Sequence, residues 1–151
     1  MIRGSFARLL ELEIHEPFSI ARVNLTIDGV TRRPAEVDFI VDSGSHFTCL
    51  QPNDATLWAG ITEEKLRDPY AWPATMGGAG IGGGSIFPMP AAFTFRHESG
   101  RRQTIRQTIQ IAHLTPANMY MPSLMGWDLL RHFRLLLDYD AGEVHLTRRA
   151  R

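Results

Sequence analysis

Apolar and polar residues alternate with a period of two along much of this chain, and this alternation constrains the fold more than any other feature. It runs through residues 23–27, stops at the turn signal Asp28-Gly29, and resumes through residues 37–41. A half-buried β-hairpin shows this spacing and this turn chemistry. The chain is therefore expected to build its core from strands.

The alternation returns twice downstream. Residues 91–114 predict two strands around the turn Glu98-Ser99-Gly100, and residues 133–146 predict two more around Asp140-Ala141-Gly142. No internal sequence repeat is visible. The expected fold class is all-β and mostly antiparallel.

Helical patterns are few and short. Pro52-Asn53-Asp54 predicts a helix that reaches Trp58, with Asn53 or Asp54 as its cap, and residues 126–133 predict a C-terminal helix. Residues 60–75 are polar, aperiodic and contain prolines, so they are expected to form a surface excursion.

Length and charge narrow the possible functions. The 151 residues suit one domain, with an expected core at about 18–147 and a basic tail at 148–151. The formal net charge is zero, so no basic field favours nucleic acid or an anionic membrane as a partner.

No apolar run reaches the roughly 18 residues of a membrane span. Glutamates interrupt the first residues, so a soluble cytoplasmic protein is expected if the chain is complete at its start.

Metal and thiol chemistry are not indicated. Cys49 is the single cysteine and lies in an apolar stretch, which favours a buried small hydrophobic side chain. Trp58, Trp72 and Trp127 are interpreted as core or interface residues. The histidines that show no metal-ligand spacing are His15, His46, His97, His113, His132 and His145.

Six of the 13 glycines lie within residues 76–84, in the stretch MGGAGIGGGSIFP. The spacing Gly78-x-Gly80-x-x-Gly83 matches the dinucleotide-binding fingerprint, but two prolines just after it forbid the helix that should follow. A hairpin arm with a freely bending backbone is the better interpretation. Nucleotide binding is an alternative that an ATP or NAD titration would test.

One segment combines a strand, a turn and an acid. In FIVDSGSHFTCL an apolar strand runs into Asp42, and Ser43-Gly44 then turns the backbone. Asp-Ser-Gly alone is common in turns and fits a capping aspartate. A carboxylate at the end of a buried strand must also be desolvated, so it needs partners. Ser43 and Ser45 lack the Gly-x-Ser-x-Gly elbow of serine hydrolases.

These residues resemble the retropepsin-like family of aspartic peptidases. The family signature is an apolar strand, then Asp, Thr or Ser, Gly, and Ala, Ser or Thr, which here reads FIVDSGS. A second signature, two apolar residues and a glycine before a C-terminal helix, matches Leu124-Met125-Gly126, and GWDLLRHFRLLLDYD is similar to its continuation in cellular and bacterial members. The family's flap, which closes over bound peptide, is assigned here to Met76, Gly77, Gly78, Ala79, Gly80, Ile81, Gly82 and Gly83. The two signatures and the flap together cover most of residues 20–146.

The resemblance implies a closed β-barrel with one short C-terminal helix and a glycine-rich flap hairpin. It implies an aspartic endopeptidase that acts on peptides or proteins and uses no metal or organic cofactor. Two carboxylates about 3 Å apart share one proton, so one activates water while the other donates to the scissile carbonyl. This chain has one Asp-Ser-Gly and is too short for two catalytic lobes, so the second carboxylate is expected from the Asp42 of a second copy. A dimerisation or peptide-binding module with little or no turnover is the alternative.

The resemblance also implies roles for the residues after Asp42. Ser43 would hydrogen-bond across the dimer, and Gly44 would let the backbone approach the substrate. Ser45 could hydrogen-bond the outer carboxylate oxygen and favour its ionised form. That contact predicts a more acidic pH optimum than an alanine at position 45 would give.

The chain departs from the viral pattern at three positions. Acidic residues often stand where this chain has His46 and Phe47, and an arginine often stands where it has Trp127. The acid-to-arginine contact between the two signatures is therefore missing. Another tie between the two regions is expected.

Overall fold

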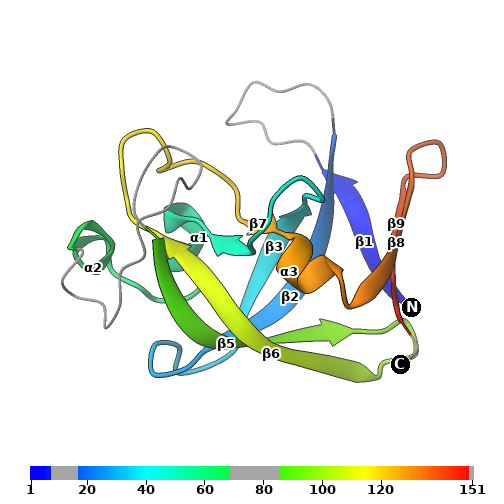
Figure 1. Cartoon of the computed structure of the whole chain (residues 1–151), viewed down its shortest axis with the longest axis horizontal. Helices are drawn as coiled ribbons and strands as arrows, with labels where there is room; N and C mark the ends of the chain where they lie inside the picture. Colours follow the sequence, from blue (N-terminus) through cyan, green and yellow to red (C-terminus); the bar gives the residue numbers. More distant parts are fainter. Residues whose placement is uncertain (8–16, 69–85, 150–151) are drawn as a thin grey trace.

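The computed structural model describes residues 1–7, 17–68 and 86–149 (Figure 1). Strands hold 50% of the described residues and three short helices hold 12%, so the prediction of a mostly β chain is confirmed. The described residues form three helices, whereas the sequence pattern predicted two. The strands are β1 (Ile2–Ala7), β2 (Phe18–Ile27), β3 (Ala35–Val41), β4 (Cys49–Leu50), β5 (Ile86–Arg96), β6 (Arg102–Ala112), β7 (Leu124–Met125), β8 (Phe133–Asp138) and β9 (Glu143–Arg148). The helices are α1 (Pro52–Leu57), α2 (Glu63–Arg67) and α3 (Trp127–Leu130).

Two long hairpins, β2–β3 and β5–β6, carry most of the alternating pattern. β2 and β3 are antiparallel, with Val23 opposite Val37, and β5 pairs with β6 over the full length of both strands. Gly29 and Gly100, in the two turns, have φ of 72° and 79°, a backbone conformation that favours glycine. Both predicted hairpins are confirmed.

β8 and β9 form the third predicted hairpin, and β1 connects it to the rest of the sheet. β1 pairs with β9 on one side and with β2 on the other, as Figure 1 shows at its right. Ile2 belongs to the hydrophobic core, so the packed structure starts before residue 18. Arg148 lies in β9, and Arg149 donates hydrogen bonds to two backbone carbonyls beside the start of β8. These two residues therefore belong to the fold rather than to a tail, while residues 150–151 lie outside the described ranges.

Six strands close into a ring through their pairings. The order β2–β3–β7–β4–β6–β5 returns to β2, because β2 pairs with both β3 and β5. The β3–β7 and β4–β6 pairs are parallel, and the other four pairs of the ring are antiparallel. The two short strands meet each other through Cys49 and Leu124.

The ring is built from two halves with the same order of elements. β2, β3, β4 and α1 form the first half, and β5, β6, β7 and α3 form the second. Each half inserts its short strand beside the second strand of the other half, so that β7 lies next to β3 and β4 lies next to β6. The two halves are thus interlocked and must share one core.

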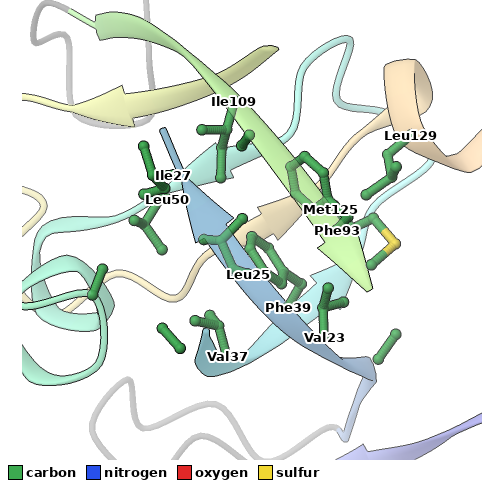
Figure 2. Packing of buried hydrophobic residues seen from close by; sticks show 14 of the residues in the cluster. Val23, Leu25, Ile27, Val37, Phe39, Leu50, Phe93, Ile109, Met125 and Leu129 are labelled. Carbon is green, nitrogen blue, oxygen red and sulfur yellow. The ribbon is translucent and has the colours of Figure 1, made fainter. Parts of the chain in front are cut away.

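Side chains from both halves fill that core (Figure 2). In β2 and β3 the odd-numbered residues are buried, as the period-two pattern predicts. Burial of each large apolar side chain contributes about 1.5–3 kcal/mol relative to exposure. The core residues labelled in Figure 2 are Val23, Leu25, Ile27, Val37, Phe39, Leu50, Phe93, Ile109, Met125 and Leu129.

The start of α1 differs from the prediction. Its N-cap is Gln51, which makes no side-chain capping bond, and Pro52 is the first helical residue. Proline suits this position because it has no N–H to satisfy and its φ is already helical. Neither Asn53 nor Asp54 is therefore the cap.

α2 interrupts the surface excursion expected at residues 60–75. Thr62 caps it by accepting a hydrogen bond from the backbone N–H of Lys65, and Leu66 is buried. A threonine cap followed by two glutamates is a helix start that the sequence interpretation overlooked. Residues 69–75 lie outside the described ranges.

α3 is shorter than predicted. It spans four residues after the N-cap Gly126, whereas the expectation was a helix over 126–133. Phe133 already begins β8 and is buried in the core. Apolar residues that suggested one helical face are therefore divided between a short helix and a strand.

Candidate active site

Asp42 follows the last residue of β3. Its backbone N–H donates to the carbonyl of Met125 in β7 at 3.0 Å, and its Oδ1 accepts the N–H of Gly44 at 2.9 Å. Asp42 is half-buried, whereas Ser43 and Gly44 are exposed. The carboxylate is thus held in a defined direction and remains accessible to solvent.

Ser45 does not make the predicted contact with the Asp42 carboxylate. Its hydroxyl donates to the carbonyl of Phe47 at 2.9 Å, and its backbone N–H donates to the carbonyl of Asp42 at 3.3 Å. A hydroxyl has one hydrogen to donate, so the Phe47 carbonyl takes the bond expected for the carboxylate. The predicted effect of Ser45 on the pH optimum therefore loses its structural basis within this chain.

The second signature lies directly beside the Asp42 loop. Leu124 and Met125 are buried in β7, and Gly126 follows as the N-cap of α3. A Cβ on Gly126 would overlap the backbone of Phe47. Only glycine allows this close approach, so the structure brings the two predicted motifs into contact and gives Gly126 a steric role.

Backbone hydrogen bonds tie the Asp42 loop to the start of α3. The N–H of Trp127 donates to the carbonyl of Ser45 at 2.8 Å, and the N–H of Asp128 donates to the carbonyl of His46 at 3.2 Å. The first N–H groups of a helix have no partner within the helix, so they are available for this role. The helix start thereby fixes the path of the loop after Asp42.

A buried threonine and a helix aspartate complete the tie. Asp128 Oδ1 accepts the backbone N–H of Thr48 at 2.9 Å and its hydroxyl at 2.7 Å, while the Thr48 hydroxyl oxygen accepts the N–H of Gly126 at 3.1 Å. This cluster supplies the tie expected in place of an acid-to-arginine contact. Sequence reasoning missed both residues. Their signals were an acid in the first turn of a helix and a threonine within an apolar run.

The same arrangement occurs a second time with the roles of the two halves exchanged, so that the second half holds the start of α1. Asp54 Oδ2, in the first turn of α1, accepts the N–H of Ser123 at 3.2 Å and its hydroxyl at 2.6 Å. The Ser123 hydroxyl oxygen accepts the N–H of Gln51 at 3.0 Å. Burial raises the pKa of Asp54 above its ordinary value, and the bonds from Ser123 oppose that rise. Each half thus holds the helix start of the other through a hydroxyl and a carboxylate.

Two aromatic side chains near Asp42 are exposed. Phe47 is 49% exposed and Trp127 is 49% exposed, and both lie on the segments that the loop and α3 bring together. Trp58 is also exposed. Of the predicted core or interface positions, the core is therefore excluded for Trp58 and Trp127 and an interface stays a prediction, while Trp72 lies outside the described ranges. Large apolar surface beside a fixed carboxylate suits contact with another chain.

The position equivalent to Asp42 in the second half carries no acid. Val41 pairs with Met125 in the β3–β7 ladder, and Ile111 pairs with Leu50 in the β4–β6 ladder, so Ala112 occupies the place of Asp42. Residues 113–123, which connect β6 to β7, contain neither aspartate nor glutamate. The repeat of structure therefore does not provide a second carboxylate.

The remaining site predictions concern the flap, the thiol and metals. The flap residues Met76–Gly83 lie outside the described ranges. Cys49 is buried, as predicted, and burial together with the charge of Asp128 raises the pKa of its thiol to about 12. Among residues 1–7, 17–68 and 86–149, no three His, Cys, Asp or Glu side chains are grouped as a metal site would require.

In the described part of the chain, every helix is too short to cross a bilayer. Comparison with protein-family models and with curated proteins found no match to this chain.

Proposed function

We propose that this chain is an aspartic endopeptidase of the retropepsin-like type, active as a two-fold homodimer in which each subunit supplies Asp42. The observation that carries the proposal is the contact between the DSGS and LMG segments. The N–H of Asp42 is bonded to Met125, and Gly126 packs on Phe47. Each motif is common by itself, but their contact in space is what the proposed architecture requires.

The strand arrangement gives further support. A closed ring of six strands, with α3 directly after β7, is consistent with the barrel and C-terminal helix of that family. The flap at residues 76–83 stays a prediction. A cytoplasmic location also stays a prediction, which cell fractionation would test.

The proposed dimer follows from the single acid. Asp42 has Ala112 as its counterpart, so the described halves cannot pair two carboxylates at this place. A two-fold axis beside the exposed Ser43-Gly44 turn would bring two Asp42 side chains together, because an isologous interface places identical residues opposite each other. Ser43 is then free to hydrogen-bond across the interface.

In the proposed reaction one carboxylate is ionised and its partner holds the shared proton. The ionised group takes a proton from water as the water oxygen bonds to the scissile carbonyl carbon, and the partner gives its proton to the carbonyl oxygen. The tetrahedral diol then collapses. The peptide nitrogen receives the first proton, a hydroxyl proton returns to the partner, and the C–N bond breaks. The pair ends with one shared proton, as it began.

The Asp42→Asn variant tests this proposal. Cleavage of fluorescein-labelled casein should fall by about 10²–10⁴-fold, because asparagine can neither accept nor return the proton. Asp140→Asn, at the exposed β8–β9 turn, is the matched control and should cleave as the wild type does. Analytical ultracentrifugation should show that both variants keep the dimer.

Subunit mixing tests whether both acids are needed. With about a threefold excess of Asp42→Asn chains, random pairing leaves about a quarter of the wild-type chains in wild-type dimers, and activity per wild-type chain should fall to that level. Unchanged activity per wild-type chain would show that one Asp42 in the dimer is enough for cleavage. A wild-type protein that binds casein without cleaving it, equally well with Asp42→Asn, would instead establish the non-catalytic module.

A further inference from the structure

A pocket of the described structure lies outside the Asp42 loop. It has a volume of about 560 Å³ and lies between α1, the outer faces of β2 and β3, and the segment that precedes β7. None of residues 42–48 lines it. The pocket is therefore separate from the proposed catalytic loop and needs its own explanation.

One wall of the pocket is acidic. Glu36 and Asp38 lie on the outward face of β3, because the alternation of that strand directs residues 35, 37 and 39 into the core. Arg22 of β2 binds both carboxylate oxygens of Asp38, at 2.7 and 2.8 Å, and approaches Glu36 only to 3.5 Å. A single guanidinium thus faces two carboxylates, and the Glu36 side chain stays 59% exposed.

The end of α1 and the segment before β7 give the pocket an exposed, largely apolar surface, while Asn53 and Asp54 line it from the start of α1. Leu57 and Trp58, at the end of α1, are 62% and 57% exposed, and Tyr120 is 66% exposed. Met121 and Pro122 extend this surface toward β7. Large apolar side chains gathered around a cavity and left in water mark an interaction surface.

We propose that this pocket binds a basic, apolar peptide segment of a protein partner, in which an arginine or lysine stands next to a large aliphatic or aromatic residue. The aliphatic or aromatic side chain would pack against Leu57, Trp58 and Tyr120. The cation would lie near Glu36, where the acidic wall has an excess of negative charge, and could also face the indole of Trp58. The excess negative charge of the pocket would repel nucleic acid and anionic lipid, so neither is expected to bind there.

The test uses three capped tripeptides as probes on the ¹⁵N-labelled Asp42→Asn variant, in which the proposed cleavage is suppressed. Acetyl-Leu-Arg-Leu-amide should shift the Trp58 indole N–H and the amides of Leu57 and Tyr120, with a dissociation constant in about the millimolar range. Acetyl-Leu-Glu-Leu-amide and acetyl-Ser-Arg-Ser-amide should each bind at least about tenfold more weakly, because one lacks the charge match and the other lacks the apolar contact.

Two pairs of variants assign the contacts. Glu36→Gln and Leu57→Ser should each weaken binding of the Leu-Arg-Leu probe by at least about threefold. The matched controls, Glu64→Gln on α2 and Leu136→Ser on β8, replace exposed residues away from the pocket and should leave it unchanged.

Three outcomes would overturn the proposal. They are the absence of a saturable shift at Trp58 with the Leu-Arg-Leu probe at tens of millimolar, equal binding of the Leu-Glu-Leu probe, and shifts confined to the segment around Asp42. None of them bears on casein cleavage by the wild-type protein. Failure of this site and failure of the proposed peptidase activity are therefore distinguishable.

Discussion

The two halves of the ring share an order of elements and differ at the end of their second strand. The first half, β2 to α1, has Asp42 there, and the second half, β5 to α3, has Ala112. The connection after Asp42 reaches β4 in six residues, whereas the connection after Ala112 reaches β7 through residues 113–123. The proposed chemistry therefore belongs to the first half, and the second half has a supporting role.

The halves also differ in the residue that precedes each helix. In both, an aspartate in the first helical turn binds a hydroxyl and an N–H of the other half. The N-cap is Gly126 where α3 meets the Asp42 loop, and it is Gln51 in α1. A Cβ at Gly126 would overlap the backbone of Phe47, so substitutions at the helix start beside Asp42 are expected to be the more costly.

The largest effect is expected from Gly126→Ala. The new Cβ would overlap the Phe47 backbone, which cannot move without displacing the Asp42 loop, so the free energy of unfolding should fall by about 3 kcal/mol. Gly44→Ala is the control, since its Cβ would meet only the side-chain Oδ1 of Asp42, at 3.2 Å. Urea unfolding measures both. A loss below about 0.5 kcal/mol for Gly126→Ala would contradict the steric role assigned to this glycine.

A smaller effect is expected when each aspartate is truncated. Asp128→Ala should cost about 2–3 kcal/mol, because Oδ1 accepts three hydrogen bonds and the buried Thr48 loses its partner. Asp54→Ala should cost only about 1 kcal/mol, because removal of a desolvated carboxylate offsets part of the loss. Asp140→Ala, at an exposed turn, is the control for both. Equal losses would show that the two contacts are equivalent.

The smallest effect concerns pH. Burial raises the pKa of folded Asp54 above the ordinary value of 3.8, so the folded state binds its proton more tightly than the unfolded state does. The contribution of Asp54 to the free energy of unfolding therefore falls as pH rises from below 3.8 through the folded pKa.

Asp54→Asn removes this titration. The stability of Asp54→Asn relative to the wild type should therefore increase as pH rises through that window, in urea unfolding measured at several pH values. Asp140→Asn serves again as the control. A difference that stays constant with pH, or that changes in the opposite direction, would contradict the assigned shift.

The hairpins and the Asp42 turn could be predicted because they depend on local signals. The alternation in β2 and β3, and the glycines at the turns, determine both strand faces and the chain reversal. The Asp-Ser-Gly turn likewise follows directly from the strand before it.

The crossing of β4 and β7 could not be predicted in this way. Two residues are too few to show a period, and the partners of both strands come from the other half. The Thr48–Asp128 and Ser123–Asp54 clusters depend on that crossing, so the sequence could not show which residues pair, although Asp128 and Thr48 each had a local signal. β1 was missed as well, because it is held by pairing with β9 at the far end of the chain.

The crossing strands also affect synthesis on the ribosome. β7 separates β3 from β4, yet its residues Leu124 and Met125 are made long after both of its neighbours. Until β7 is synthesised, the nascent first half has an unpaired sheet edge and an incomplete hydrophobic core, and both features favour aggregation. Closure of the ring is therefore late, and β7 completes the environment of an aspartate made much earlier.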